Sequence, residues 1–116
     1  MEDIKIKLKK FAEDRNWEQF HSPKNLVMAL SGEVGELTEI FQWLTEEQSK
    51  LENLDPKTLS RTKEELADVF LYILRLADKL NVDLISEAHK KIEINEDKYP
   101  IDLAKNNAIK YNLRDE

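Results

Sequence analysis

Two pairs of acidic residues have the spacing and surroundings that suit cation binding. Each pair holds two residues three positions apart, and the four are Glu33 with Glu36 and Glu65 with Asp68. On an α-helix, residues at this spacing lie about 60° apart on one face, so the two carboxylates of a pair converge. Four carboxylates beside apolar side chains repel one another and resist dehydration unless cations neutralise them. The spacing therefore predicts a metal site.

The ligand types that the chain lacks narrow the choice of metal. The sequence has no Cys and two His residues, whereas zinc sites favour Cys and His ligands. Di-iron bundles use Glu-x-x-His, but here Glu36 and Asp68 stand at the fourth position of the two motifs. Oxygen ligands favour Mg²⁺, Mn²⁺ or Ca²⁺, and Mg²⁺ commonly binds through a few carboxylates plus substrate phosphates. A phosphorylated substrate is therefore implied.

A solvated helix face also produces acidic pairs at this spacing, so one pair alone is a weak signal. Two pairs on consecutive long helices are a stronger one. The first pair has Val34 and Leu37 as neighbours, and the second has Leu66 and Val69. Such neighbours place part of each pair near the interior of a bundle. The rival hypothesis is a catalytically silent helical interaction module whose acidic faces are only solvated.

Substrate contacts would come from side chains, because the chain has neither a Gly-x-x-x-x-Gly-Lys-Ser/Thr loop nor a Gly-x-Gly-x-x-Gly motif. Lys91 can hold phosphates and shares a helix face with Asn95, four positions on. Trp17, Trp43 and Tyr72 can stack on a base, although a core role fits each equally well. We interpret His21 as a hydrogen-bonding loop residue rather than a catalyst, and His89 as a surface residue.

Composition favours an all-α protein with one domain over residues 1–116. Gly occurs twice and Pro three times, so turn residues are scarce and helix formers abound. The net charge of −6 argues against non-specific nucleic-acid binding. No apolar run approaches the roughly 18 residues of a membrane span, and the start lacks the apolar centre of a signal peptide. A cytoplasmic location is the default expectation.

Capping residues and prolines predict the bounds of four helices. The expected ranges are Asp3 to Arg15, Ser22 (N-cap) to Trp43 or Leu44, Ser60 or Thr62 to Leu80, and Asp83 (N-cap) to a point before Pro100. A polar connection of about 15 residues, 45–59, separates the second and third helices. Thr62 with Glu65 matches a capping box, but a start nearer Ser60 leaves Glu65 free to pair with Asp68.

Apolar residues at the helical period predict the buried faces of these helices. They are Ile4, Leu8, Phe11 and Ala12; Leu26 or Val27, Leu30, Val34, Leu37, Phe41 and Leu44; Leu66, Val69, Phe70, Ile73, Ala77 and Leu80; and Leu84, Ile85, Ala88 and Ile92. Gly32 and Gly35 cost about 1 kcal/mol each inside a helix, so we expect close approach of a backbone or a ligand there. The second and third helices have two apolar sides, and a monomer would leave part of these in water. We therefore predict that oligomerisation completes the bundle. The tail, 101–116, could fray or pack on a neighbouring subunit through anchors such as Ile109, Tyr111 and Leu113.

Several segments together resemble one known family. They are residues 11–26 (FAEDRNWEQFHSPKNL), 32–37 (GEVGEL), 41–43 (FQW), 64–68 (EELAD), 91–95 (KIEIN) and 98–100 (KYP). In combination they resemble the MazG-like nucleoside triphosphate pyrophosphohydrolases, and most closely the dCTP pyrophosphatase-type branch. The similarity extends over about residues 4–111.

The resemblance implies a four-helix MazG-like assembly that dimerises, commonly as a dimer of dimers, giving a homotetramer. It implies hydrolysis of (deoxy)nucleoside triphosphates, dCTP or related and modified dNTPs, to the monophosphate and pyrophosphate in nucleotide-pool housekeeping. The cofactor would be Mg²⁺, with Mn²⁺ as a substitute. Glu33, Glu36, Glu65 and Asp68 match the family's catalytic metal ligands. The matched substrate-binding positions are Trp17, Trp43, Tyr72, Lys91 and Asn95.

Overall fold

The computed structural model describes residues 1–105 and 108, and its regular elements are all helices. The long helices are α1 (Glu2–Asp14), α2 (Pro23–Phe41), α3 (Pro56–Lys79) and α4 (Leu84–Lys98), followed by the short α5 (Ile101–Ala104). Two 3₁₀ turns, η1 (Glu18–Phe20) and η2 (Leu51–Asn53), lie in the connections. No strand occurs among the described residues, so the all-α prediction is confirmed. None of the helices within residues 1–105 has the length and apolar composition needed to cross a membrane.

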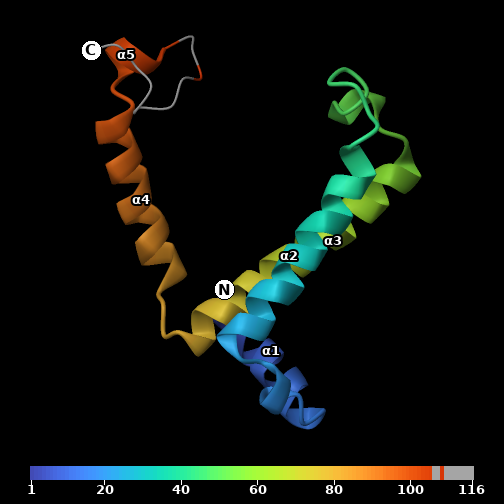
Figure 1. Cartoon of the computed structure of the whole chain (residues 1–116), viewed down its shortest axis with the longest axis vertical. Helices are drawn as coiled ribbons and strands as arrows, with labels where there is room; N and C mark the ends of the chain where they lie inside the picture. The colour runs from blue at the N-terminus through green and yellow to red at the C-terminus, as the bar shows by residue number, and fades with distance from the viewer. Residues whose placement is uncertain (106–107, 109–116) are drawn as a thin grey trace. The chain divides into compact units, whose positions relative to one another are not determined.

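Contacts within the chain define two units, one ending at Val82 and one starting at Asp83. The expected single domain over 1–116 stays a prediction. In the first unit, α2 and α3 run side by side and α1 packs on α3 (Figure 1). The buried apolar side chains of this unit are Ala12, Leu26, Ile40, Leu74 and Ala77.

Capping residues define where α2 and α3 begin. The Ser22 side chain accepts a hydrogen bond from the Asn25 backbone N–H at 3.2 Å, and Pro23 occupies the first turn, as predicted. The same arrangement recurs at Asp55, which accepts from the Thr58 N–H at 2.9 Å and precedes Pro56. Both helices therefore start with an N-cap followed by proline, which needs no backbone donor at that position.

The predicted start of α3 was wrong, because Asp55 and Pro56 cap a helix that begins four residues before Ser60. Thr62 is consequently inside α3, where its hydroxyl donates to the Thr58 carbonyl oxygen at 2.8 Å. Glu65 lies well inside the helix too, so its carboxylate is not engaged at a helix start. The predicted end of α2 was also slightly late, since the helix ends at Phe41 rather than Trp43.

Several residues predicted to be buried are exposed in the single chain. They are Phe11, Val34, Leu66, Phe70 and Leu80 in the first unit, and Ile85, Ala88 and Ile92 in α4. Of the alternatives Leu26 and Val27, Leu26 is the buried one. The exposed fraction of Leu66 is 53% and that of Val34 is 44%. The first unit has three long helices, so α2 and α3 have too few neighbours for both of their apolar sides to be covered. The sequence pattern shows apolar residues on both sides and does not indicate which side is covered.

No close backbone approach explains the two helical glycines. Apart from the backbone of α2 itself and the adjacent residues, a Cβ atom added at Gly32 or Gly35 would meet no heavy atom within 4 Å among the residues that the structure describes. The predicted contact is therefore not made inside the described chain, and nothing in the structure explains the glycines.

The second unit contains α4, whose bounds agree with the prediction. Asp83 caps it by accepting from the Ser86 N–H at 3.0 Å, and the helix ends before Pro100. The helical turn α5, Ile101–Ala104, was not predicted. The expected anchors Ile109, Tyr111 and Leu113 lie outside the described residues.

Candidate metal centre and adjoining cavity

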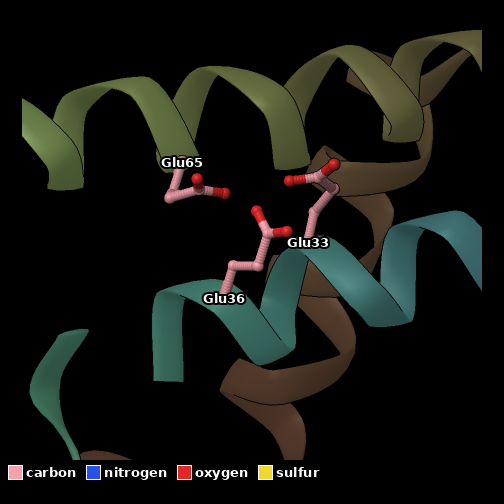
Figure 2. Close-up of side chains that lie close together, drawn as sticks. All are labelled: Glu33, Glu36 and Glu65. Carbon is pink, nitrogen blue, oxygen red and sulfur yellow. The ribbon is translucent and has the colours of Figure 1, made fainter. Parts of the chain in front are cut away.

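Three of the four predicted carboxylates converge between α2 and α3. Glu33 and Glu36 project from α2 and Glu65 projects from α3, and Figure 2 shows the three side chains pointing toward one another. One carboxylate oxygen from each lies within 4.8 Å of the others. The three-residue spacing on α2 and the side-by-side packing of the helices produce this cluster. Oxygen atoms at such separations can share one hard divalent cation.

Asp68 lies one turn after Glu65 on α3, outside the close group of three. Its negative charge still contributes to the raised pKa of Glu33, so it acts on the same cluster. Asp68 also lines the cavity described below. It therefore connects the carboxylates with that cavity.

The cluster is electrostatically unfavourable without a cation. Burial, together with the adjacent Glu65 and Glu36 carboxylates and the Asp68 charge, raises the pKa of Glu33 to about 7. Burial is also the main cause that raises the pKa of Glu65, and the charges of Glu36 and Asp68 add to it. One oxygen of Glu33 and one of Glu65, Oε2 in both, are buried without a hydrogen-bond partner. Buried carboxylate oxygens that lack donors are costly, and a divalent cation would satisfy them, so the residues present fit a metal ion.

A cavity of about 450 Å³ lies between α1, the connection 16–22 and α3. Its apolar and aromatic walls are formed by Ile4, Leu8, Phe11, Trp17, Leu71 and Tyr72, and its polar side chains are Lys7, His21, Asp68 and Arg75. The volume falls within the range of small-molecule sites, and the lining, mostly apolar with a few polar groups, is typical of them. Trp17 and Tyr72, predicted as base-stacking residues, thus lie in one cavity beside Asp68.

The other three predicted substrate residues are not brought to this cavity within the first unit. Trp43 follows the end of α2, is 87% exposed and does not line the cavity. Lys91 and Asn95 are exposed residues of α4, in the second unit. Their roles stay predictions.

Two cavity residues were missed or given a minor role by sequence reasoning. Arg75 was not singled out, although an arginine between Leu74 and Leu76 on an apolar helix face could have indicated a buried charged group. Its exposed fraction is only 5%. His21 is a hydrogen-bonding loop residue, as expected, but its partner is Arg75, and both residues line the cavity.

Comparison with known proteins gives consistent results. The sequence model of the MazG-like family matches residues 28–113. Human dCTP pyrophosphatase 1 is 43% identical over 111 residues, and the rat protein of the same name is 42% identical. Each alignment covers 96% of this chain and 65% of the relative, so the chain spans just under two thirds of those proteins. The crystal structure of a pyrophosphatase from Archaeoglobus fulgidus is similar with a TM-score of 0.79 at 40% identity, covering 86% of this chain and 92% of that one.

Proposed function

Because the chain belongs to the MazG-like family, we propose that it is a nucleoside triphosphate pyrophosphohydrolase. The proposed reaction is hydrolysis of (deoxy)nucleoside triphosphates, dCTP or related and modified dNTPs, to the monophosphate and pyrophosphate. The observation that carries the proposal is the convergence of Glu33, Glu36 and Glu65, with two unsatisfied buried oxygens, next to a cavity of nucleoside size. The names of the human and rat relatives support dCTP as a substrate. Nucleotide-pool housekeeping is the proposed role.

Mg²⁺ is the proposed cofactor, with Mn²⁺ as a substitute. Glu33, Glu36, Glu65 and Asp68 would hold it, since all four offer only oxygen ligands. When bound, the ion offsets negative charge on the triphosphate and on the leaving pyrophosphate. The carboxylates cluster on two packed helices rather than on loops, so their relative positions are set before substrate arrives.

The cavity is the proposed site of the nucleoside. A base entering it exchanges water for apolar walls and for the faces of Trp17 and Tyr72, and such stacking is worth roughly 1–3 kcal/mol per base in nucleic-acid complexes. Asp68 lines this cavity and acts electrostatically on the cluster, so a nucleotide seated here places its phosphates toward the carboxylates. Trp43, Lys91 and Asn95 are proposed as further substrate contacts.

A homo-oligomer, a tetramer built as a dimer of dimers, is the proposed assembly of single-domain chains. Val34, Leu66 and Phe70 on α2 and α3 are exposed apolar side chains, and they support this assembly. A second copy of the chain that packs on them would remove their apolar surface from water, which is favourable. The proposal includes small-molecule nucleotides as the only substrates, with no nucleic-acid or membrane partner, and a cytoplasmic location.

A product assay separates this proposal from a silent helical module. Purified protein is incubated with each common NTP and dNTP, with Mg²⁺ or with EDTA, and products are resolved by ion-exchange chromatography. We expect equal amounts of monophosphate and pyrophosphate, only with the metal. Release of the diphosphate and inorganic phosphate would contradict the reaction type. No product with any nucleotide would favour the interaction module.

A further inference from the structure

Five charged side chains form one ion-pair cluster between the end of α3 and the N-terminal part of the chain. The Arg75 guanidinium pairs with the carboxylate of Glu18 in η1 and lies 3.4 Å from Asp78 Oδ2 on its own helix. Lys79 pairs with the second oxygen of Glu18. The Lys5 ammonium of α1 lies 3.9 Å from Asp78 Oδ1. Charge therefore ties both α1 and the connection after it to one stretch of α3.

Apolar packing contributes little to the attachment of α1. Ala12 is the buried residue of this helix. Its larger apolar side chains Ile4, Leu8 and Phe11 line the cavity of about 450 Å³. Side chains that face a cavity lack partner atoms on that side, so they pack less well than side chains of a filled core. The ion-pair cluster is consequently a major part of what joins α1 to α3.

The first helix and its connection are joined to each other as one unit. Asn16 has a φ of 55°, the left-handed conformation that ends a helix and turns the chain. The Trp17 N–H then donates back to the Ala12 carbonyl oxygen at 2.8 Å. We call residues 2–21 the N-terminal flap, and the flap is joined to α2 at the Ser22 cap. A displacement of α1 therefore carries the connection with it.

The cluster places Glu18 of the flap opposite two cations of α3. The Lys79 ammonium, with a smaller contribution from the Arg75 guanidinium, lowers the pKa of Glu18 against the effect of burial, so this carboxylate stays ionised at neutral pH. An arginine keeps its charge when it is buried, and loss of its partner leaves that charge uncompensated. Moving the flap away would separate Glu18 from both cations, which opposes opening.

We propose that residues 2–21 are a movable flap over the cavity and that the ion-pair cluster holds this flap closed on α3. Opening would separate the ion pairs while the apolar packing of α2 on α3 stays in place. Salt screens ion pairs whose members are partly exposed, as Glu18, Lys79 and Asp78 are. The fraction of closed molecules should therefore depend on ionic strength and on the charges of the cluster.

The consequence for nucleotides rests on the proposed function. A nucleotide in the cavity touches walls that belong to both α1 and α3, so it binds the closed form better than the open one. When only part of the molecules is closed, the apparent affinity falls by that fraction. A weakened ion-pair cluster should therefore raise KM, and saturating nucleotide should close the flap again.

Amide hydrogen exchange of the full chain, without nucleotide, measures how often the flap opens. Glu18→Gln removes the partner of a buried arginine, and we expect exchange of flap peptides to rise about tenfold or more. Peptides of α2 should exchange as in the wild type. Glu13→Gln, the same change at an exposed position of α1, is the matched control and should have no effect.

Lys79 allows a milder test with a conservative rescue. Lys79→Gln removes one cation from Glu18 at a partly exposed side chain, and we expect a rise of about threefold or more in flap exchange. Lys79→Arg keeps the charge and should exchange as the wild type does. With dCTP as substrate, Lys79→Gln should raise KM and leave kcat close to that of the wild type, and Lys79→Arg should restore KM.

Salt gives a reading that a change in packing would not produce. Raising NaCl from about 0.1 M to about 1 M shortens the Debye length from about 10 Å to about 3 Å. Flap exchange of the wild type should rise over this range, and that of Lys79→Gln should rise less because one ion pair is already absent. Peptides of α2 report any general effect of salt on exchange.

The outcomes separate this inference from the proposed function. Unchanged flap exchange in both Glu18→Gln and Lys79→Gln would overturn the role of the ion-pair cluster. A rise by the same factor in α2 peptides would overturn the flap as a separate moving unit. A lower kcat with unchanged KM in Lys79→Gln would overturn the link with nucleotide affinity. Absence of turnover in the wild type would overturn the proposed function, while hydrogen exchange would still decide the flap.

A variant that fails to fold does not leave the question open. If Glu18→Gln does not fold, Lys79→Gln and Lys5→Gln replace it, because both remove a partly exposed partner from the same cluster. Lys5→Gln acts at the start of α1 and Lys79→Gln at the connection. Increased flap exchange in both variants would support the inference, and wild-type exchange in both would overturn it.

Discussion

Glu33 on α2 and Glu65 on α3 each bury one carboxylate oxygen that has no hydrogen-bond donor, and their ligand atoms lie within 4.8 Å of each other. Two facing carboxylates without donors lower the stability of the fold unless a proton or a cation lies between them. The metal-free and metal-bound states should therefore differ in stability, in pH response and in sensitivity to loss of a carboxylate.

Replacing Glu36 by Gln should abolish turnover and leave the fold intact. The amide keeps the shape of the side chain but removes one negative charge from a repelling cluster, so the metal-free Tm should stay unchanged or rise slightly. We expect kcat/KM to fall at least about a hundredfold, as for loss of a group that acts in the transition state. Glu39→Gln, at an exposed position of the same helix, is the control. Wild-type rates in Glu36→Gln would exclude Glu36 as an essential ligand.

The metal-free protein should lose stability as pH rises from about 4.5 to about 7. The folded-state pKa of Glu33 is raised from 4.5 to about 7, so the native state holds a proton that the unfolded state has released in this window. The free energy of unfolding then falls with increasing pH, by roughly 1 kcal/mol once solvent screening is allowed for. Thermal denaturation in EDTA between pH 4.5 and 7.5 measures the slope. Glu33→Gln should flatten it, and an equal slope in that variant would contradict the assignment.

Mg²⁺ should raise the Tm of the wild type at neutral pH more than it raises the Tm of a ligand variant. Binding to the folded state alone stabilises it by about 2.7 kcal/mol at a concentration one hundred times Kd. Mn²⁺ should act similarly, because it also accepts oxygen ligands. Differential scanning fluorimetry of the wild type and of Glu65→Gln over a metal titration checks this. An identical Tm increase in both proteins would show that the ion binds elsewhere.

The carboxylate cluster was predictable because helix geometry is local. A three-residue spacing places Glu33 beside Glu36 whatever surrounds the helix, and the only further requirement is that α2 and α3 pack side by side. Glu65 belongs to the close group of carboxylates and Asp68 does not. Which of the two faces α2 depends on how α3 is rotated about its own axis relative to α2. Spacing along one helix does not determine that rotation.

Burial and long-range partners were less predictable. The apolar period at Leu66 and Phe70 is correct for a helix, yet it does not say whether the covering surface comes from this chain. The contact between Arg75 and His21 joins residues 54 positions apart, which no local pattern encodes. The early start of α3 could have been predicted from the sequence, because Asp55-Pro56 indicates a helix start as clearly as Ser22-Pro23 does.

The exposed apolar residues of α2 and α3 lead to a prediction about assembly. Val34, Leu66 and Phe70 are 44%, 53% and 38% exposed in the single chain, and apolar surface left in water costs about 25 cal/mol per Å². We expect light scattering at micromolar concentration to give a mass at least twice 13.7 kDa. Leu66→Glu should lower that mass by placing a charge in the interface, whereas Glu64→Lys, at an exposed polar position, should not. A wild-type monomer that hydrolyses dNTPs at full rate would show that one chain forms a complete site.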